Sequence, residues 1–103
     1  MNRFAHNRHR HDTNHRVIVT VLKDLGCSVL DCSQGPERGA PDLLVGMAGV
    51  NYLAELKAPG EALRHEQLEW HEAWRGERPV TLWSAAQAIA WVNAMRRRAR
   101  RCA

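Results

Sequence analysis

Aromatic side chains other than tryptophan are scarce in this sequence, which holds one Phe and one Tyr beside four Trp. Long apolar runs are also missing, and none approaches the roughly 20 residues that a membrane-spanning helix needs. The first residues are polar and basic, without the apolar stretch of a secretory signal. Because the three cysteines form no even set and no Cys-x-x-Cys pair, a disulfide framework and a structural zinc site are both disfavoured. We therefore expect reduced thiols and a cytoplasmic location.

The charge is divided between the two ends and the middle of the chain. Residues 1–16 hold four arginines and one aspartate, and residues 96–103 hold five arginines. Between them lie six basic and ten acidic side chains, so an acidic body carries two basic ends. We expect residues 1–12 to form a flexible arm and residues 96–103 an arginine-rich tail. Basic ends attract polyanions such as nucleic acids, although they also serve merely to keep a small domain soluble.

Apolar periodicity and turn residues predict one α/β domain with the element order α-β-β-β-α-β-α. A chain of 103 residues can bury a real core but leaves no room for a second domain. Helices are expected at about 13–25, 63–74 and 85–95, and strands at about 27–32, 42–45, 50–57 and 79–83. The expected architecture is a small mixed sheet of about four strands with helices packed on it, within a domain spanning residues 13–95.

Glu55 and Lys57 stand two residues apart near the end of an apolar strand, so their side chains point to the same face. A strand between helices is usually apolar on both faces, and burying a carboxylate and an ammonium there is costly unless each has a partner. That cost favours a functional interpretation. The structural alternative is a surface salt bridge on an edge strand, which is the common explanation for an isolated Glu-x-Lys pair.

Asp42 supplies a second carboxylate at the start of the preceding strand. If the two strands form a hairpin through residues 47–49, the start of one lies beside the end of the other, and Asp42 approaches Glu55 and Lys57. Two carboxylates and the backbone carbonyl of Leu56 are then suited to one hard divalent cation. Lys57 would either stabilise charge on a phosphate or help to orient and deprotonate the attacking water.

The motifs GAPDLLVG, NYLAELKAP and LRHEQLEWHEAW, in this order, resemble the PD-(D/E)xK nuclease superfamily. Within it the chain is most similar to the VRR-NUC group, the virus-type replication-repair nucleases, over about residues 13–95. That group has a Gly-x-Pro-Asp-Leu motif, then Glu-Leu-Lys, then a helix with Gln and Trp three residues apart. The resemblance implies a restriction-endonuclease-like core and Mg²⁺- or Mn²⁺-dependent hydrolysis of phosphodiester bonds in DNA.

The resemblance also implies roles for individual residues. Asp42 and Glu55 match the metal-binding acids, Lys57 matches the catalytic lysine, and Gln67 matches the helix glutamine that supports the site. Many relatives carry a further glutamate on the first helix. This sequence has no obvious equivalent there, and Asp12 or His15 is the candidate replacement.

Other candidates are weaker. Arg38 precedes Asp42 in the loop and is a candidate phosphate contact, as are the tail arginines Arg96, Arg97 and Arg98. His71, one turn beyond Gln67, is expected to be a surface histidine. The arm carries several more histidines, whose spacing fits no structural zinc site: His6, His9, His11 and His15. Tryptophans at helical positions are expected to pack in the core or in a dimer contact: Trp70, Trp74 and Trp91.

The sequence therefore predicts a structure-specific endonuclease for branched or junction DNA. Cutting two strands symmetrically needs two active sites, so a homodimer is expected. Two alternatives remain open. One is a nucleic-acid-binding module that keeps the fold without cleavage, and the other is a non-enzymatic subunit whose basic ends bind RNA or a protein.

Overall fold

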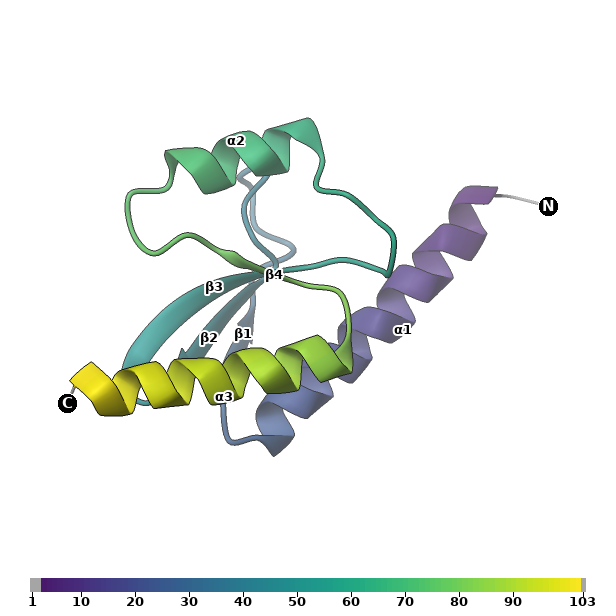
Figure 1. The fold of residues 1–103 in the computed structure, drawn as a ribbon. Helices are drawn as coiled ribbons and strands as arrows, with labels where there is room; N and C mark the ends of the chain where they lie inside the picture. The colour runs from purple at the N-terminus through teal and green to yellow at the C-terminus, as the bar shows by residue number, and fades with distance from the viewer. Residues whose placement is uncertain (1–2, 103) are drawn as a thin grey trace.

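The structure, a computed structural model, describes the backbone of residues 3–102 and the side chains of residues 13–102. Within these residues the elements follow the predicted order (Figure 1). Their bounds are α1 Arg3–Asp24, β1 Ser28–Asp31, β2 Leu43–Met47, β3 Val50–Leu56, α2 His65–Ala73, β4 Val80–Leu82 and α3 Ala85–Cys102.

The four strands form one mixed sheet in the order β1-β2-β3-β4, which confirms the predicted architecture. Neighbouring strands are antiparallel except for β3 and β4, which are parallel and joined through α2. The helices α1 and α3 lie together on one face of the sheet, while α2 stands apart from them (Figure 1). The crossover through α2 places that helix on the opposite face, above the end of β3.

The core lies between the sheet and the pair α1 and α3. Its fully buried members come from both helices and from the alternating inward positions of the strands, as helical and strand periodicity require. They include Ile18, Leu22, Leu43, Val45, Ala54, Leu82, Ala88 and Val92. Tyr52 closes this core near the end of α3, where its ring meets Trp91 edge to face at 5.4 Å. The opposite positions of β3 face α2, and Glu55 is one of them.

Two helices extend further than the sequence predicts. The helix α1 begins at Arg3 rather than near Thr13, and α3 continues to Cys102 through most of the arginine-rich tail. Arginine has a high helix propensity, and cations in the last turn of α3 interact favourably with the helix dipole. The side chains of residues 1–12, and with them the histidines of the predicted arm, lie outside the described residues. None of the described helices is long and apolar enough to cross a membrane.

A two-residue turn sets the register between β2 and β3. Ala48 has φ 52° and Gly49 has φ 77°, and positive φ at both central residues is typical of a type I′ hairpin. The turn pairs Met47 with Val50 and carries this register to Leu43 and Ala54. The hairpin predicted from the sequence is therefore present, and it determines which residues meet at its far end.

Ala48→Asn should stabilise the protein by about 0.5–1 kcal/mol, because asparagine tolerates the left-handed conformation better than alanine. Urea unfolding at neutral pH measures the difference. Ala62→Asn, at a loop position whose own φ is not positive, is the matched control and should change stability little. Equal effects of the two substitutions would contradict the strain at Ala48.

Candidate active site

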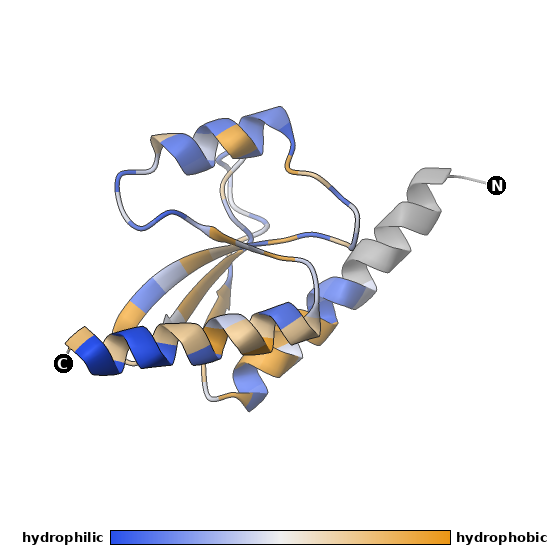
Figure 2. Cartoon of the chain, in the orientation of Figure 1, coloured by the Kyte–Doolittle hydropathy of each residue, from blue (hydrophilic) through white to orange (hydrophobic). Residues whose placement is uncertain are grey.

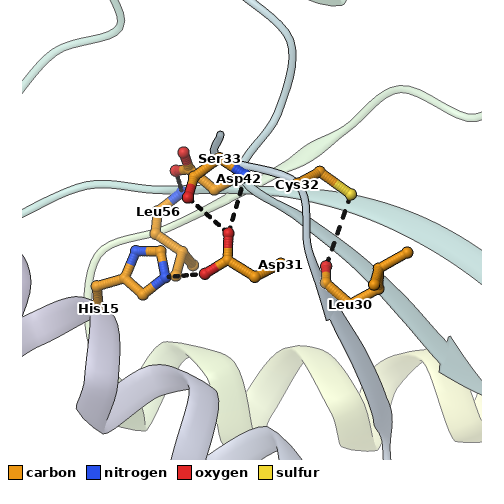
Figure 3. Close-up of polar contacts among 7 residues, drawn as sticks. All are labelled: His15, Leu30, Asp31, Cys32, Ser33, Asp42 and Leu56. Atoms are coloured by element: carbon orange, nitrogen blue, oxygen red, sulfur yellow. Dashed lines mark hydrogen bonds and ion pairs between the residues drawn. The ribbon is translucent and has the colours of Figure 1, made fainter. Parts of the chain in front are cut away.

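The carboxyl groups of Asp42 and Glu55 meet at the open end of the β2–β3 hairpin. Continuing the register one residue beyond Leu43 and Ala54 sets Asp42 opposite Glu55, and the Asp42 carboxyl is close enough to raise the pKa of Glu55. Asp42 Oδ2 also accepts a hydrogen bond of 2.9 Å from the backbone N–H of Leu56 (Figure 3). The approach of Asp42 to Glu55 that the hairpin predicts is thus observed.

Glu55 is only 1% exposed, and α2 supplies a partner for each of its oxygens. Gln67 Nε2 donates to Glu55 Oε2 at 3.3 Å, and His71 Nε2 lies 3.3 Å from Glu55 Oε1. The orientation of the Gln67 amide is fixed by a second hydrogen bond, because its Oε1 accepts from the backbone N–H of Arg64 at 2.8 Å. Gln67 and His71 are four residues apart, so one face of α2 holds the whole carboxyl group.

Burial and the neighbouring Asp42 carboxyl raise the pKa of Glu55 from 4.5 to about 9, against the opposing effects of Lys57 and Arg64. The pair therefore holds a proton near neutral pH when no cation replaces it. Burial, with a smaller effect of Arg78, lowers the pKa of His71. A neutral imidazole can donate one hydrogen bond to Glu55 without adding a second charge to the buried site.

Lys57 is 7% exposed and lies at the end of β3, close enough for its charge to act on Glu55. Its backbone N–H donates to Leu82 of β4 at 3.0 Å. Its backbone carbonyl accepts from Asn14 Nδ2 at 2.8 Å, and the same amide donates to the Trp83 carbonyl at 3.0 Å. Asn14 on α1 therefore ties together the ends of β3 and β4, the point at which Lys57 leaves the sheet.

The loop before Asp42 packs against α2. Trp70 Nε1 donates to Glu37 Oε1 at 2.9 Å. Gly39 has φ 85° and passes so close to Glu66 that a Cβ at this position would collide with its backbone. Arg38 is highly exposed and lies 3.7 Å from Glu66, a weak contact at the rim of the site. One helix thus positions Glu55 directly and Asp42 through its loop.

His15, a candidate replacement for a first-helix glutamate, faces β1. Its Nε2 lies 3.3 Å from Asp31 Oδ2, as Figure 3 shows. The other oxygen of Asp31 accepts from the Ser33 backbone N–H at 2.8 Å and from the Ser33 hydroxyl at 2.5 Å. These hydrogen bonds fix the first residues of the loop that runs from β1 to Asp42. The other candidate, Asp12, lies outside the described side chains.

The three tail arginines that the sequence offers as phosphate contacts lie far from this site. Arg96 donates to the Leu25 carbonyl at the end of α1. Arg98 Nη2 contacts both carboxylate oxygens of Glu77, at 2.9 and 2.8 Å, and its guanidinium lies over the Tyr52 ring. Both side chains are engaged within the fold, whereas Arg97 is exposed.

Sequence reasoning missed two residues of the site. His71 is 2% exposed, so the expectation of a surface histidine was wrong. Its spacing of four from Gln67 was the available signal, since both must share a helix face. The sequence offered no indication of a role for Asn14 in the site. Its bonds join residues 43 and 69 positions apart, and no local pattern indicates them.

Oxygen ligands for a divalent cation are present in the contact between Asp42 and Glu55. Because Lys57 N–H points to β4, the preceding residue, Leu56, directs its N–H and C=O to the other side, where Asp42 lies. Two carboxylates and one carbonyl suit a hard cation that keeps several waters. Among the described residues, no group of three or more His, Cys, Asp or Glu side chains is arranged to hold a metal ion, so a cation here would depend on the two carboxylates, the carbonyl and water.

Similarity to known proteins is found at the level of structure. No protein-family model and no curated protein matches the chain. A solved structure described as a VRR_NUC domain has a TM-score of 0.69 and 26% sequence identity, covering 82% of this chain and 95% of that one. The chain is similar to a VRR-NUC domain in fold and sequence. The restriction-endonuclease-like architecture expected from the motifs is thereby confirmed.

The metal-free VRR-NUC-like domain should lose stability as pH rises from 7 to 9. The folded state retains a proton on Glu55 that the unfolded chain releases above about 4.5, so deprotonation favours unfolding. The low pKa of His71 acts oppositely, but only below its ordinary value of 6.5. Thermal unfolding in EDTA measures the trend. Asp42→Asn removes the repelling carboxyl and should flatten the profile, and an equally steep fall in this variant would contradict the role of Asp42.

Proposed function

We propose that this chain is a metal-dependent DNA endonuclease of the PD-(D/E)xK type. The observation that carries the proposal is the contact between the Asp42 and Glu55 carboxyl groups beside the buried Lys57. Two adjacent carboxylates repel each other, so a proton or a cation between them stabilises the pair. Such an arrangement costs stability, and the similarity to a VRR_NUC domain supports phosphodiester hydrolysis as the chemistry that uses it.

Asp42, Glu55 and the Leu56 carbonyl would hold the cation, which we propose to be Mg²⁺ or Mn²⁺. When bound, such an ion polarises the phosphate and lowers the pKa of a water molecule. Lys57 places a positive charge beside Glu55, where it stabilises negative charge developing on the phosphate. Gln67 and His71 keep the Glu55 carboxylate in one orientation, so that little reorganisation accompanies the reaction.

The proposed substrate is branched or junction DNA. This assignment rests on the resemblance of the motifs to structure-specific nucleases, and a homodimer would supply two sites for symmetric cuts. Arg38 supports contact with a phosphate near the site, because its guanidinium is 88% exposed and only weakly paired with Glu66. The alternative is a nucleic-acid-binding module that uses the same fold without cleavage.

Cleavage of labelled single-stranded, duplex, flap and four-way-junction DNA with Mg²⁺ or Mn²⁺ tests the proposal. Asp42→Asn and Lys57→Ala should each lower the cleavage rate by about 100-fold or more, because each removes a charge that acts on the reacting phosphate. Glu69→Gln, on the exposed side of α2, is the matched control and should retain full activity.

A wild-type protein that cuts none of these substrates would refute the endonuclease. If it still binds DNA in a salt-sensitive way, unchanged by the two substitutions, the binding module is the correct function. Sedimentation of the protein alone and with a four-way junction tests the homodimer separately.

His71→Leu should weaken metal binding by about 10- to 100-fold, since partners that orient a metal-binding carboxylate have effects of this size. The Mg²⁺ concentration at half-maximal rise of the thermal midpoint measures binding without any cleavage assay. His71→Gln can still donate to Glu55 and should restore part of the affinity. His65→Gln, exposed on the same helix, is the control. An unchanged Mg²⁺ requirement in His71→Leu would show that His71 only fills space.

A further inference from the structure

The C-terminal end of α2 presents a tryptophan ring at the surface of the domain. Trp74 is the C-cap of this helix, and its backbone N–H donates to the Trp70 carbonyl at 3.1 Å. Its indole is stacked on that of Trp70, with ring centroids 4.8 Å apart and an angle of 12° between the ring planes. Trp70 is in turn held by its hydrogen bond to Glu37. Trp74 is nevertheless 47% exposed, so a flat aromatic surface is held in one orientation on the outside of the protein.

A hollow of about 310 Å³ lies beside this ring. It is lined by Ala73, Trp74, Arg75 and Gly76. Gly76 passes so close to the ring that a Cβ at this position would lie only 2.8 Å from Trp74 Nε1. The hollow therefore combines one aromatic ring, small neighbours and one cation, a set that suits a flat ring system linked to an anionic group.

Consecutive contacts connect the exposed ring with the candidate catalytic carboxyl. The Trp70 ring meets the His71 ring edge to face at 6.4 Å, and His71 Nε2 lies 3.3 Å from Glu55 Oε1. Only two side chains of the same helix thus stand between Trp74 and Glu55. The helix α2 lies over the sheet face that carries Glu55, apart from α1 and α3 (Figure 1). The ring and the candidate site therefore lie on the same side of the sheet.

The charges near the ring favour a polyanion. Arg75 and Arg78 are both exposed, and the ion pairs among the described residues involve neither of them. Glu77, which lies between them in the sequence, is paired with Arg98 at 2.8 Å. Burial and the charge of Arg78 both lower the pKa of His71, so this cation acts on the site side of the helix. Two cations are therefore available for phosphates close to the ring.

The surroundings of the ring suit a nucleobase better than a protein partner. Figure 2 shows that α2 and the segment from α2 to β4 are mostly hydrophilic. Leu68, the other exposed large apolar residue of α2, lies about 120° around the helix from Trp74 at 3.6 residues per turn. A protein interface needs a broad complementary area, whereas base stacking needs one flat ring with cations beside it.

We propose that Trp74 is a stacking platform for an unpaired nucleobase of the substrate, with Arg75 in contact with the adjoining phosphate. This inference rests on the proposed endonuclease function and deepens it, because it names the substrate feature that is bound: an unpaired nucleotide on the α2 side of the site, such as a flap provides. A base inside a duplex is covered on both faces by its neighbours, whereas every unpaired base has a free face. The platform would therefore select DNA structure without reading sequence.

The test measures DNA binding by wild type, W74A, W74F and L68A with fluorescence anisotropy in EDTA, so that no strand is cut. The three DNAs are a duplex, the same duplex with an unpaired flap, and the flap with abasic sites in place of its bases. W74A should bind the flap about 5- to 100-fold more weakly than wild type, the range for loss of one stacked base. W74F keeps an aromatic face and should retain most of the affinity. L68A is the matched control on the same helix and should bind as wild type does.

The duplex and the abasic flap should be bound equally by all four proteins, because neither offers a base to the ring. The salt dependence separates the ring from the cation. R75Q should lower the log–log salt slope on the flap by about 0.7, which corresponds to one phosphate contact of a single strand. W74A should leave this slope unchanged, because an indole carries no charge.

Equal binding of the flap and the abasic flap by wild type would overturn the proposal without any variant. So would equal affinities of wild type and W74A for the flap. A lower sedimentation mass of W74A, with the same weakening on all three DNAs, would assign the ring to a contact between two copies of the chain and overturn the base site. Base-dependent binding without cleavage would keep the base site and remove the endonuclease, whereas cleavage without base dependence would keep the endonuclease alone.

Discussion

The contact between the Asp42 and Glu55 carboxyl groups is the constraint on which the rest of the structure depends. It is unfavourable by itself, because a buried carboxylate loses hydration and a neighbouring carboxylate repels it. The fold holds it by long-range means: a hairpin whose turn lies at the opposite end, a backbone N–H that binds Asp42, and two side chains of α2 that bind Glu55. Retaining such a costly pair lowers the stability of the domain, which is expected of a site that serves the proposed catalysis.

The nine residues of α2 organise the site from one side of the sheet. Gln67 joins the helix start to Glu55 because its amide has two ends, one fixed by the Arg64 N–H and one directed at the carboxylate. On the neighbouring face, Trp70 binds Glu37 in the loop that precedes Asp42. Displacing α2 would therefore disturb Asp42 and Glu55 together. The distance between the two carboxyl groups thus depends on the position of this one helix.

Local patterns in the sequence were sufficient to predict the order of helices and strands, the β2–β3 hairpin and the approach of Asp42 to Glu55. Alternation in β3 and the glycine at position 49 depend on a few adjacent residues, and such signals can be read directly. Asn14 and Arg98 could not be read in this way, because their partners lie far along the chain at Lys57 and Glu77. His71 is an intermediate case. Its helical spacing from Gln67 was visible, but only the position of α2 over the sheet shows that this face is buried.

Most of the positive charge of the chain lies away from the Asp42 and Glu55 carboxyl groups, and the electrostatics of that pair gives a physical reason for this distribution. An arginine next to Glu55 would lower its pKa and occupy the place of a cation, so strong positive charge at the site competes with metal binding. Among the groups that act on Glu55, Arg64 has the smallest effect, and Lys57 supplies the larger opposing charge. The exposed arginines at the distal end of α3 lie where screening by salt weakens their influence on the carboxyl pair.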